Sequence, residues 1–462
     1  MINCFEETVL KNRILPEEWR SQTALDELSQ FLQSNWEQRS VFYDDSDISS
    51  RQQFLSFTGH KGLRTNNYIG TIVFKGKQLN IFPKMFRMEK DDSDSSELDL
   101  KHLIRNITNW IEYCTKIDYP FINIKTALED VTDLRELFVS LYIRYVKSAL
   151  DRGLFYRYED KIEECHTIKG KINFRDYICT KIPNGMADTF QCTYSNFEFD
   201  NKLNQIIKAT CKMLVSNTTK SNQKILRHIL MKLNEVSDVR CKPSDCDNIR
   251  LSYLNGNYRI ILSMSKMFLL NKTSLYEMDT RESFCFLFPT ELLFEGFISG
   301  FMQNALKGTA KVKLQASDLT LVNDVVYNGK SYGKAFTLRH DILVEHKEYG
   351  LFVLDTKYKM ISRFSGNTDL KKSISEDISQ SDLYQVREYA AKRGLNKAYL
   401  IYPLFRFEND EPSNLVLKGS IKIEEKEYDV DVHVVRLPFV FDGDINAVKE
   451  RLSKIIVDIF NA

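Results

Sequence analysis

The chain of 462 residues lacks a net charge of either sign, because 64 lysines and arginines nearly cancel 63 aspartates and glutamates. A net charge of +1 provides no overall attraction to the phosphates of nucleic acid. Any contact with DNA must therefore come from local basic patches or from a partner. The sequence also has no apolar run long enough to span a membrane, and it does not begin like a signal peptide, so we expect a cytoplasmic protein.

Two further absences concern nucleotides and zinc. No Gly-x-x-x-x-Gly-Lys-Ser/Thr loop occurs: residues 70–77 have the wrong spacing, and residues 329–331 lack the upstream glycine. The chain itself is therefore not expected to bind a nucleoside triphosphate. Cys241 and Cys246 form one isolated close pair, which argues against zinc, and the scatter of the nine cysteines fits a reducing cytoplasm.

The composition is that of a folded protein of two or three domains, with 43% hydrophobic and 12% aromatic residues. We predict an α+β multidomain protein. Residues 1–95 form a mixed, β-rich N-terminal domain that ends in an acidic, serine-rich linker. Residues 96–275 form a mainly helical middle region with a β-hairpin, and residues 276–462 form a C-terminal α/β domain.

Apolar periodicity predicts the elements of the first two parts. The predicted helices cover residues 25–31, 134–150, 203–215, 223–233 and 258–269. The predicted strands cover residues 68–74 and 78–82, which form a hairpin, and residues 155–158 and 167–174, placed around a turn. Four basic residues near this turn, Lys161, Lys169, Lys171 and Arg175, could follow a phosphate backbone, but a solvated face is the favoured interpretation.

The segment from Leu338 to Lys359 is the most informative stretch of the sequence. Its apolar runs, 342–344 and 351–354, predict two strands joined by a loop of residues 348–350, with Gly350 in the left-handed conformation. Lys347 would then pair with Leu351, and Asp341 would lie opposite Lys357. Asp355 and Lys357 are two residues apart and share a face, which Asp341 joins from the neighbouring strand.

Two carboxylates and a lysine on one face indicate a site for divalent-metal hydrolysis of phosphodiesters. Oxygen ligands suit Mg²⁺ or Mn²⁺, which can polarise the scissile phosphate and acidify a bound water. The lysine can orient that water and offset developing charge. The alternative is that both aspartates, Asp341 and Asp355, end their strands in solvated turns.

Flanking helices add two candidate residues. A helix that starts at Thr290 as N-cap carries Glu295 among apolar residues, either as a third acid facing the metal or as a helix-edge glutamate in water. A helix over residues 377–392 places Gln385 on one stripe with Ile378, Asp382 and Tyr389. Gln385 could bind the attacking water or a phosphate, although a surface amide is the more common outcome. A buried strand is expected over residues 398–403.

The chain resembles the McrC subunits of McrBC-type, modification-dependent restriction systems. The similar segments follow one another in the same order over most of the chain. They are residues 67–72 and 79–84, Arg152-Gly153-Leu154, Lys169-Gly170-Lys171-Ile172, Asp200-Asn201-x-x-Asn204, Leu293-Phe294-Glu295, Asp341, Asp355-Thr356-Lys357-Tyr358 and Asp382-Leu383-Tyr384-Gln385. His340 stands where the nuclease superfamily usually has proline, and a polar insertion covers residues 362–375.

The resemblance implies a PD-(D/E)XK restriction-endonuclease-like fold at the C-terminus. It assigns metal binding to Asp341 and Asp355, completed by the Thr356 carbonyl, and a catalytic role to Lys357, with Glu295 and Gln385 assisting. It further implies a partner, an McrB-like AAA+ GTPase hexamer that binds GTP and reads the DNA, with the N-terminal domain of this chain docked to it. Double-stranded DNA, modified or unmodified, is the implied substrate, and dimerisation through the nuclease domains is a further expectation.

A second hypothesis treats the chain as a non-catalytic adaptor that docks onto the motor ring and activates it. Residues 1–88 would then carry the function, and GTPase stimulation would survive deletion of residues 280–462. The complete Asp/Asp/Lys set favours a working nuclease.

Overall fold

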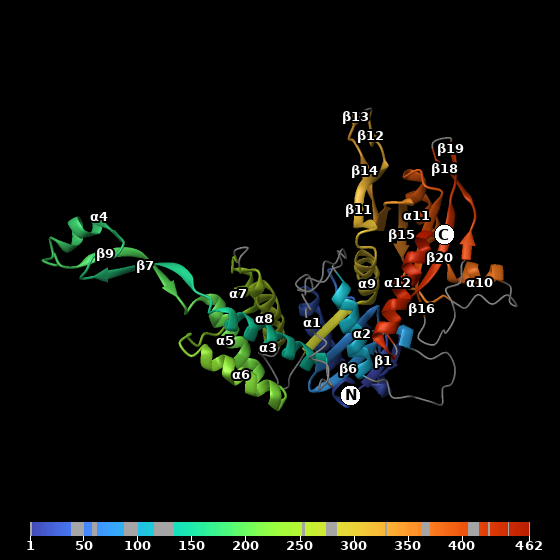
Figure 1. Cartoon of the computed structure of the whole chain (residues 1–462). Coiled ribbons are helices and arrows are strands. Elements are labelled where there is room, and N and C mark those ends of the chain that lie inside the picture. The colour runs from blue at the N-terminus through green and yellow to red at the C-terminus, as the bar shows by residue number, and fades with distance from the viewer. Residues whose placement is uncertain are drawn as a thin grey trace. The chain divides into compact units, whose positions relative to one another are not determined.

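The computed structural model contains two compact units (Figure 1). It describes residues 2–37, 50–57, 62–86, 100–114, 134–251, 255–273, 284–328, 330–361, 370–404, 415–423, 426–441 and 443–461. The discontinuous unit comprises residues 1–128, 132–134 and 281–462, and the inserted unit comprises residues 129–131 and 135–280. The domain boundaries predicted after residues 95 and 275 lie outside the described residues, and the three-part division stays a prediction.

A four-stranded sheet in the discontinuous unit joins segments that are far apart in the sequence. Its order is β1 (Ile2–Phe5), β6 (Lys77–Phe82), β5 (Tyr68–Phe74) and β10 (Phe284–Pro289). The predicted hairpin is confirmed: Phe74 pairs with Lys77, and Lys75 and Gly76 take the positive φ angles of a two-residue turn. Strand β10 pairs antiparallel with β5, so the chain returns to this sheet after the inserted unit.

Smaller elements and one helix complete this N-terminal part. They are β2 (Val9–Lys11), β4 (Gly62–Thr65) and β3 (Leu55–Phe57) in a second sheet, the 3₁₀ helices η1 (Asn12–Ile14), η2 (Glu17–Trp19) and η5 (Lys84–Phe86), and α1 (Gln22–Glu37). Helix α1 confirms the helix expected over residues 25–31. Trp19 and Trp36 lie in the apolar core between these elements and the sheet.

Two helices of the discontinuous unit approach each other closely. They are α2 (Leu100–Tyr113) and α9 (Thr290–Ala305). A Cβ atom at Gly300 would lie 1.7 Å from the Tyr113 carbonyl oxygen, so only glycine fits there. Trp110 of α2 also stacks on Phe439, with ring centroids 4.2 Å apart, which ties α2 to the C-terminal part.

A mixed six-stranded sheet forms the C-terminal part. Its order is β11 (Ala310–Val322), β14 (Ala335–His346), β15 (Gly350–Thr356), β16 (Lys397–Leu404), β20 (Asp431–Pro438) and β17 (Leu415–Leu417). Strands β15, β16 and β20 are parallel, and the other neighbours are antiparallel. The predicted succession of helix, two strands, helix and strand is therefore confirmed, with β11 as an additional strand.

Helices and short hairpins accompany this sheet. They are α10 (Leu370–Asp377), α11 (Gln380–Lys392) and α12 (Ile445–Asn461), with the hairpins β12 (Val326–Tyr327)/β13 (Lys330–Ser331) and β18 (Ser420–Ile423)/β19 (Lys426–Asp429). Val386 and Ala390 of α11 share one apolar core with Leu400 of β16 and Val432 of β20. Helix α11 thus lies on the sheet with its polar stripe near the ends of the central strands.

Two predicted helix starts were wrong. The helix expected over residues 377–392 is divided, because α10 ends at Asp377 and α11 begins at Gln380 after Ser379 as N-cap. The N-cap of α9 is Pro289, and Thr290 is the first helical residue. The Thr290 hydroxyl is directed instead toward Glu6, so it is not used to cap its own helix.

The inserted unit is helical, as expected. Its helices are α3 (Leu134–Arg152), α5 (Lys202–Val215), α6 (Lys220–Lys232), α7 (Pro243–Asp247) and α8 (Asn257–Thr273). They confirm the four helices predicted between residues 134 and 269. Among the described residues of the whole chain, no helix is long and apolar enough to cross a bilayer.

Residues 157–198 of the inserted unit form an arm that extends beyond its helices (Figure 1). The arm contains β7 (Arg157–Cys165), β8 (Lys171–Ile172), α4 (Phe174–Asp176), the π-helical segment η7 (Tyr177–Lys181) and β9 (Phe190–Glu198). The two strands predicted around a turn do not pair with each other, because β7 and β8 both pair with β9. Lys161 forms an ion pair with Glu198, and Lys169 one with Glu163, which supports the solvated-face interpretation.

Candidate active site

The β14–β15 hairpin brings the two predicted aspartates to one face. His346 pairs with Gly350 and Ile342 with Leu354, so the same register continued by one residue places Asp341 opposite Asp355. The predicted loop and the pairing of Asp341 with Lys357 were wrong, because Gly350, at φ +87°, begins the strand and residues 347–349 form the loop. The predicted partner of Asp341 is two residues away from the observed one. Because side chains alternate between the two faces of a strand, a shift of two residues keeps them on the predicted common face.

Asp341 is held by Thr356, the residue that follows Asp355. Its Oδ2 accepts hydrogen bonds from the Thr356 backbone N–H at 2.9 Å and from the Thr356 hydroxyl at 3.0 Å. Burial raises the pKa of Asp341 to about 7, and the charges of Asp355 and Glu295 contribute to that increase. Two carboxylates that both resist ionisation on one face are typical of functional sites.

Asp355 is the most buried acid of the site, with 1% of its surface exposed. Its Oδ2 lies 2.7 Å from Lys357 Nζ in an ion pair, but neither of its oxygens accepts a hydrogen bond from the part of the chain that the structure describes. Burial raises the pKa of Asp355 despite the opposing attraction of Lys357. Burial acts to lower the pKa of Lys357, but Asp355 outweighs it, so that pKa is raised. The lysine is therefore protonated.

Helix α11 contributes the predicted glutamine. Lys357 Nζ donates to Gln385 Oε1 at 3.2 Å, and Gln385 Nε2 donates to the Tyr389 hydroxyl oxygen at 2.9 Å. Asp382 on the same stripe accepts a hydrogen bond from Lys359 at 2.6 Å. Gln385 is thus not a free surface amide: it links the lysine to α11.

Glu295 of α9 lies near the two aspartates without forming a tight cluster with them. Its charge raises the pKa of both Asp341 and Asp355, and its Oε1 accepts a hydrogen bond from Gln315 at 2.8 Å. Within the described ranges, no three Cys, His, Asp or Glu side chains converge closely enough to hold a metal ion. A cation at this site would therefore depend on Asp341, Asp355, a carbonyl such as that of Thr356, and water.

Three contacts around the site were not foreseen from the sequence. The Thr356 hydroxyl binds Asp341, Tyr389 holds Gln385, and Gln315, which has a φ of +49° in β11, reaches Glu295. A positive φ at glutamine has no local sequence signal, because glutamine does not favour that conformation. The contact between Tyr389 and Gln385 could have been predicted, since the two residues lie four apart on the predicted stripe.

His340, which replaces the usual proline, is fully buried beside Asp341. Its Nδ1 lies 3.1 Å from the Ala316 carbonyl oxygen, and its Nε2 accepts a hydrogen bond from Arg393 at 3.3 Å. Burial lowers the pKa of His340, consistent with a neutral ring that donates to the carbonyl and accepts from the arginine. The histidine therefore links β14 to β11 and to the residue that follows α11.

Comparison with known proteins gives a consistent result. The model of the McrBC 5-methylcytosine restriction system component family matches residues 63–403. A chain of the solved half-complex from the tetradecameric assembly of Thermococcus gammatolerans McrB AAA+ hexamers with bound McrC is similar to this chain, with 16% identity, 99% of each chain covered and a TM-score of 0.65. At this identity, the similarity shows the fold.

Another chain, from the T. gammatolerans McrBC complex, is 18% identical with a TM-score of 0.49, and the match covers 66% of this chain and 88% of that one. No curated protein matches the sequence. The family model covers well over half of the chain, and the chain therefore belongs to the McrBC 5-methylcytosine restriction system component family.

Proposed function

We propose that this chain is the DNA endonuclease subunit of a GTP-dependent McrBC-type restriction complex, with a PD-(D/E)XK-like nuclease domain within residues 276–462. The observation that carries the proposal is the position of half-buried Asp341 opposite buried Asp355, where two carboxylates with raised pKa values lie beside one lysine, Lys357, 2.7 Å from Asp355. The lysine offsets one of the two negative charges, and the second charge is costly at a buried site unless a further cation compensates it.

The residues present fit a divalent cation. Carboxylate and carbonyl oxygens from Asp341, Asp355 and Thr356 are the ligands that Mg²⁺ and Mn²⁺ prefer, with water completing the coordination. When bound, such an ion polarises the scissile phosphate and lowers the pKa of a coordinated water. It would also favour the ionised form of both aspartates, whose pKa values are raised without it.

The chain's own residues then supply orientation and positive charge. Protonated Lys357 offsets negative charge that develops on the phosphate in the transition state and orients the attacking water. Gln385 fixes the ammonium group from the side of α11, and Tyr389 fixes the amide so that its oxygen faces the lysine. Glu295 lies close enough to influence both aspartates and assists in positioning water.

The nuclease proposal is tested in the reconstituted complex with the AAA+ partner, GTP, Mg²⁺ and methylated or unmethylated duplex DNA. Asp355→Ala and Lys357→Ala each lower cleavage by about 100-fold or more, because they remove a metal ligand and the charge that stabilises the transition state. Partner binding is unchanged. Glu348→Ala, in the exposed loop of the same hairpin, is the control and cuts normally. Wild-type cleavage by either site variant would show that the site is misassigned.

The complex requires a partner that binds GTP. The structurally similar chain comes from an assembly that contains McrB AAA+ hexamers with bound McrC. We extend this arrangement to the present chain: an McrB-like GTPase hexamer supplies GTP hydrolysis and DNA recognition, and two copies of this chain pair through their nuclease domains. The near-zero net charge of the chain agrees with DNA recognition by a partner.

The exposed apolar side chains favour the arm as the docking surface for the ring. The docking surface predicted within residues 1–95 stays a prediction, but among the described residues of that range only Val9 and Ile14 are exposed large apolar residues. The arm exposes many more, namely Tyr158, Ile162, Ile168, Phe174, Ile178, Ile182, Met186 and Phe197. A projecting surface with this composition is typical of protein–protein contacts.

The adaptor hypothesis, in which residues 1–88 carry the function, stays a prediction. An adaptor would stimulate the partner's GTPase without nicking DNA in the presence of any divalent metal. The two activities are compatible in one chain, and the Asp355→Ala variant separates them because it retains GTPase stimulation and loses cleavage.

A further inference from the structure

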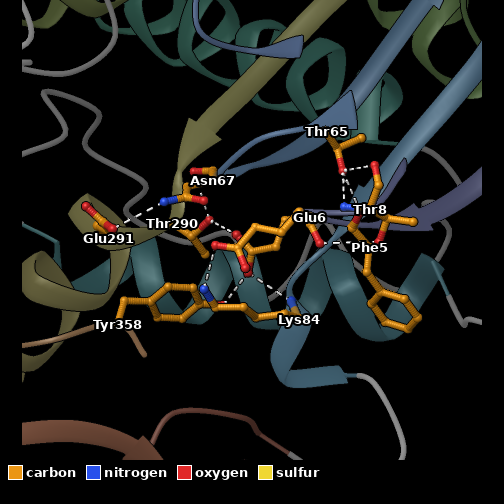
Figure 2. Close-up of polar contacts among 10 residues, drawn as sticks. Phe5, Glu6, Thr8, Thr65, Asn67, Lys84, Thr290, Glu291 and Tyr358 are labelled. Carbon is orange, nitrogen blue, oxygen red and sulfur yellow. Dashed lines mark hydrogen bonds and ion pairs between the residues drawn. The ribbon is translucent and has the colours of Figure 1, made fainter. Parts of the chain in front are cut away.

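Glu6 is a buried carboxylate that the proposed nuclease chemistry does not use. It follows β1 and is 2% exposed. Its Oε1 accepts hydrogen bonds from the Lys84 backbone N–H at 2.9 Å and from the Tyr358 hydroxyl at 2.7 Å, and its Oε2 accepts one from the Thr290 hydroxyl at 2.6 Å (Figure 2). Burial raises the pKa of Glu6, and these donors oppose that effect. Three separate segments therefore converge on one side chain.

Two of these segments carry residues of the candidate active site. Tyr358 directly follows Lys357, and Thr290 is the first residue of α9, which carries Glu295. The third segment, at Lys84, begins η5 directly after β6 and Pro83. Glu6 thus connects the N-terminal sheet to the strand end that holds the lysine and to the helix that holds the third acid.

The backbone around Glu6 is itself fixed. Its N–H donates to the Phe82 carbonyl at 2.9 Å, which extends the pairing of β1 with β6. The Thr65 hydroxyl donates to the Phe5 carbonyl at 2.8 Å and accepts from the Thr8 N–H at 2.9 Å, as Figure 2 shows. Because these bonds hold the backbone on both sides of Glu6, the N-terminal part fixes the point from which the carboxylate extends.

The Tyr358 hydroxyl needs Glu6 as its hydrogen-bond acceptor more than the Thr290 hydroxyl does. The Thr290 hydroxyl also lies 3.1 Å from the Asn67 carbonyl oxygen, so it keeps an acceptor if Glu6 is removed. Tyr358 is buried among Phe294 and Phe439, and Glu6 is the hydrogen-bond acceptor that the structure shows for its hydroxyl. Lys84 Nζ pairs with Glu7 and not with Glu6, so the contacts to Glu6 come from uncharged donors.

Lys357 lies between two anchors. Its backbone N–H donates to the Ile401 carbonyl of β16 at 2.8 Å, and the next residue, Tyr358, is bound to Glu6. A shift of the Tyr358 segment would move the Lys357 ammonium group away from Asp355, which lies 2.7 Å from it. Small displacements of this kind lower the rate of a reaction without changing how tightly substrate binds.

We propose that Glu6 is a positioning residue for the nuclease site, acting through Tyr358 to hold the Lys357 segment and through Thr290 to hold the start of α9. This inference rests on the proposed function. It makes cleavage depend on the position of the N-terminal sheet, although no residue of that sheet belongs to the candidate active site.

The test compares cleavage kinetics of Tyr358→Phe, Glu6→Ala and Glu6→Gln in the reconstituted complex. Tyr358→Phe and Glu6→Ala each lower kcat by about tenfold or more, with the KM for DNA and the stimulation of the partner GTPase unchanged. Glu6→Gln restores most of kcat, because its amide oxygen accepts from Lys84 and Tyr358 and its amide group donates to the Thr290 hydroxyl. The double variant Glu6→Ala/Tyr358→Phe is no slower than Glu6→Ala alone, since Glu6→Ala already removes the hydrogen bond that Tyr358→Phe would remove.

Controls separate this inference from the proposed function. Tyr349→Phe removes a hydroxyl from an exposed tyrosine in the hairpin loop and keeps wild-type kcat. If Asp355→Ala abolishes cleavage while Tyr358→Phe retains wild-type kcat, the nuclease proposal stands and the role of Glu6 is refuted. If Asp355→Ala cuts normally, the proposed function itself fails. Should Glu6→Ala not fold, the hydroxyl deletion at Tyr358 still decides the question.

Discussion

Asp341 and Asp355 illustrate how a site can be arranged for function at the expense of stability. Without a bound metal ion, only Lys357 among the described residues forms an ion pair with half-buried Asp341 or buried Asp355, and the pKa of Asp341 rises to about 7. The folded protein must then either keep a proton or carry an unfavourable charge. Such strain is expected where a ligand later supplies the missing positive charge.

Asp341→Asn should therefore stabilise the protein in the absence of divalent cations. The pKa of Asp341 in the folded protein, about 7, is above its ordinary value of 3.8. The folded state thus holds the proton more tightly than the unfolded chain, and stability is lost as pH rises from about 4 to about 7. Asparagine cannot ionise, so at pH 8 it should increase the free energy of unfolding by an amount on the order of 2 kcal/mol.

Denaturant unfolding in a chelator at pH 6 and pH 8 measures this effect. The gain from Asp341→Asn is larger at pH 8 than at pH 6, whereas Glu348→Gln, in the exposed hairpin loop, leaves the free energy of unfolding unchanged. The substitution also abolishes cleavage. A variant that is less stable than the wild type at pH 8 would contradict the proposed strain.

Single residues also show which contacts local sequence patterns predict and which they do not. The common face of Asp341, Asp355 and Lys357 followed from strand alternation, and the helical stripe placed Gln385 on the same side as Tyr389. The contact between Glu6 and Tyr358 joins residues 352 positions apart. No periodicity in the sequence encodes such a separation, and the residues around Glu6 gave no reason to select it.

At the scale of elements, the arm is the feature whose strand pairing local patterns missed. Its strands were expected near residues 155–174, but their common partner, β9, lies at Phe190–Glu198. At the helical end of the arm, Phe174 and Ile178 are 65% and 60% exposed.

Phe174→Ser together with Ile178→Ser should lower stimulation of the partner GTPase by about tenfold or more, because exposed aromatic and aliphatic anchors supply much of the energy of a protein contact. Both side chains face solvent, so the thermal midpoint of the isolated chain should not change. The control is Met231→Ser, on α6 of the same unit, where the side chain is 74% exposed. Full stimulation by the double variant would exclude the arm end as the docking surface.

The chain forms two units, and the sequence of one is inserted into the sequence of the other. The discontinuous unit is completed after the chain has formed the inserted unit, since β10 returns to pair with β5 and α9 packs against α2. The position of Glu6 beside Tyr358 and Thr290 follows from this return of the chain. Each unit has its own buried apolar residues.

Unfolding in denaturant should therefore proceed in two steps that different probes separate. The chain has three tryptophans, Trp19, Trp36 and Trp110, and all are buried in the discontinuous unit. Tryptophan fluorescence reports that unit alone, whereas far-UV circular dichroism reports the helices of both units. We expect transitions with different midpoints, because each unit loses its own core. Coincident transitions would show that the units unfold as one cooperative block.

The amino-acid order was sufficient to indicate the long helices of the inserted unit, strands β14, β15 and β16 of the C-terminal sheet, and the face on which two acids and a lysine meet. These features depend on the alternation of apolar residues over short distances, which the backbone converts directly into structure. The hairpin register, the partner of β7, the burial of Asp355 and the link from Glu6 to Tyr358 follow only from the tertiary structure. They arise from packing between segments remote in the chain, where many arrangements satisfy the same local pattern and long-range burial selects one.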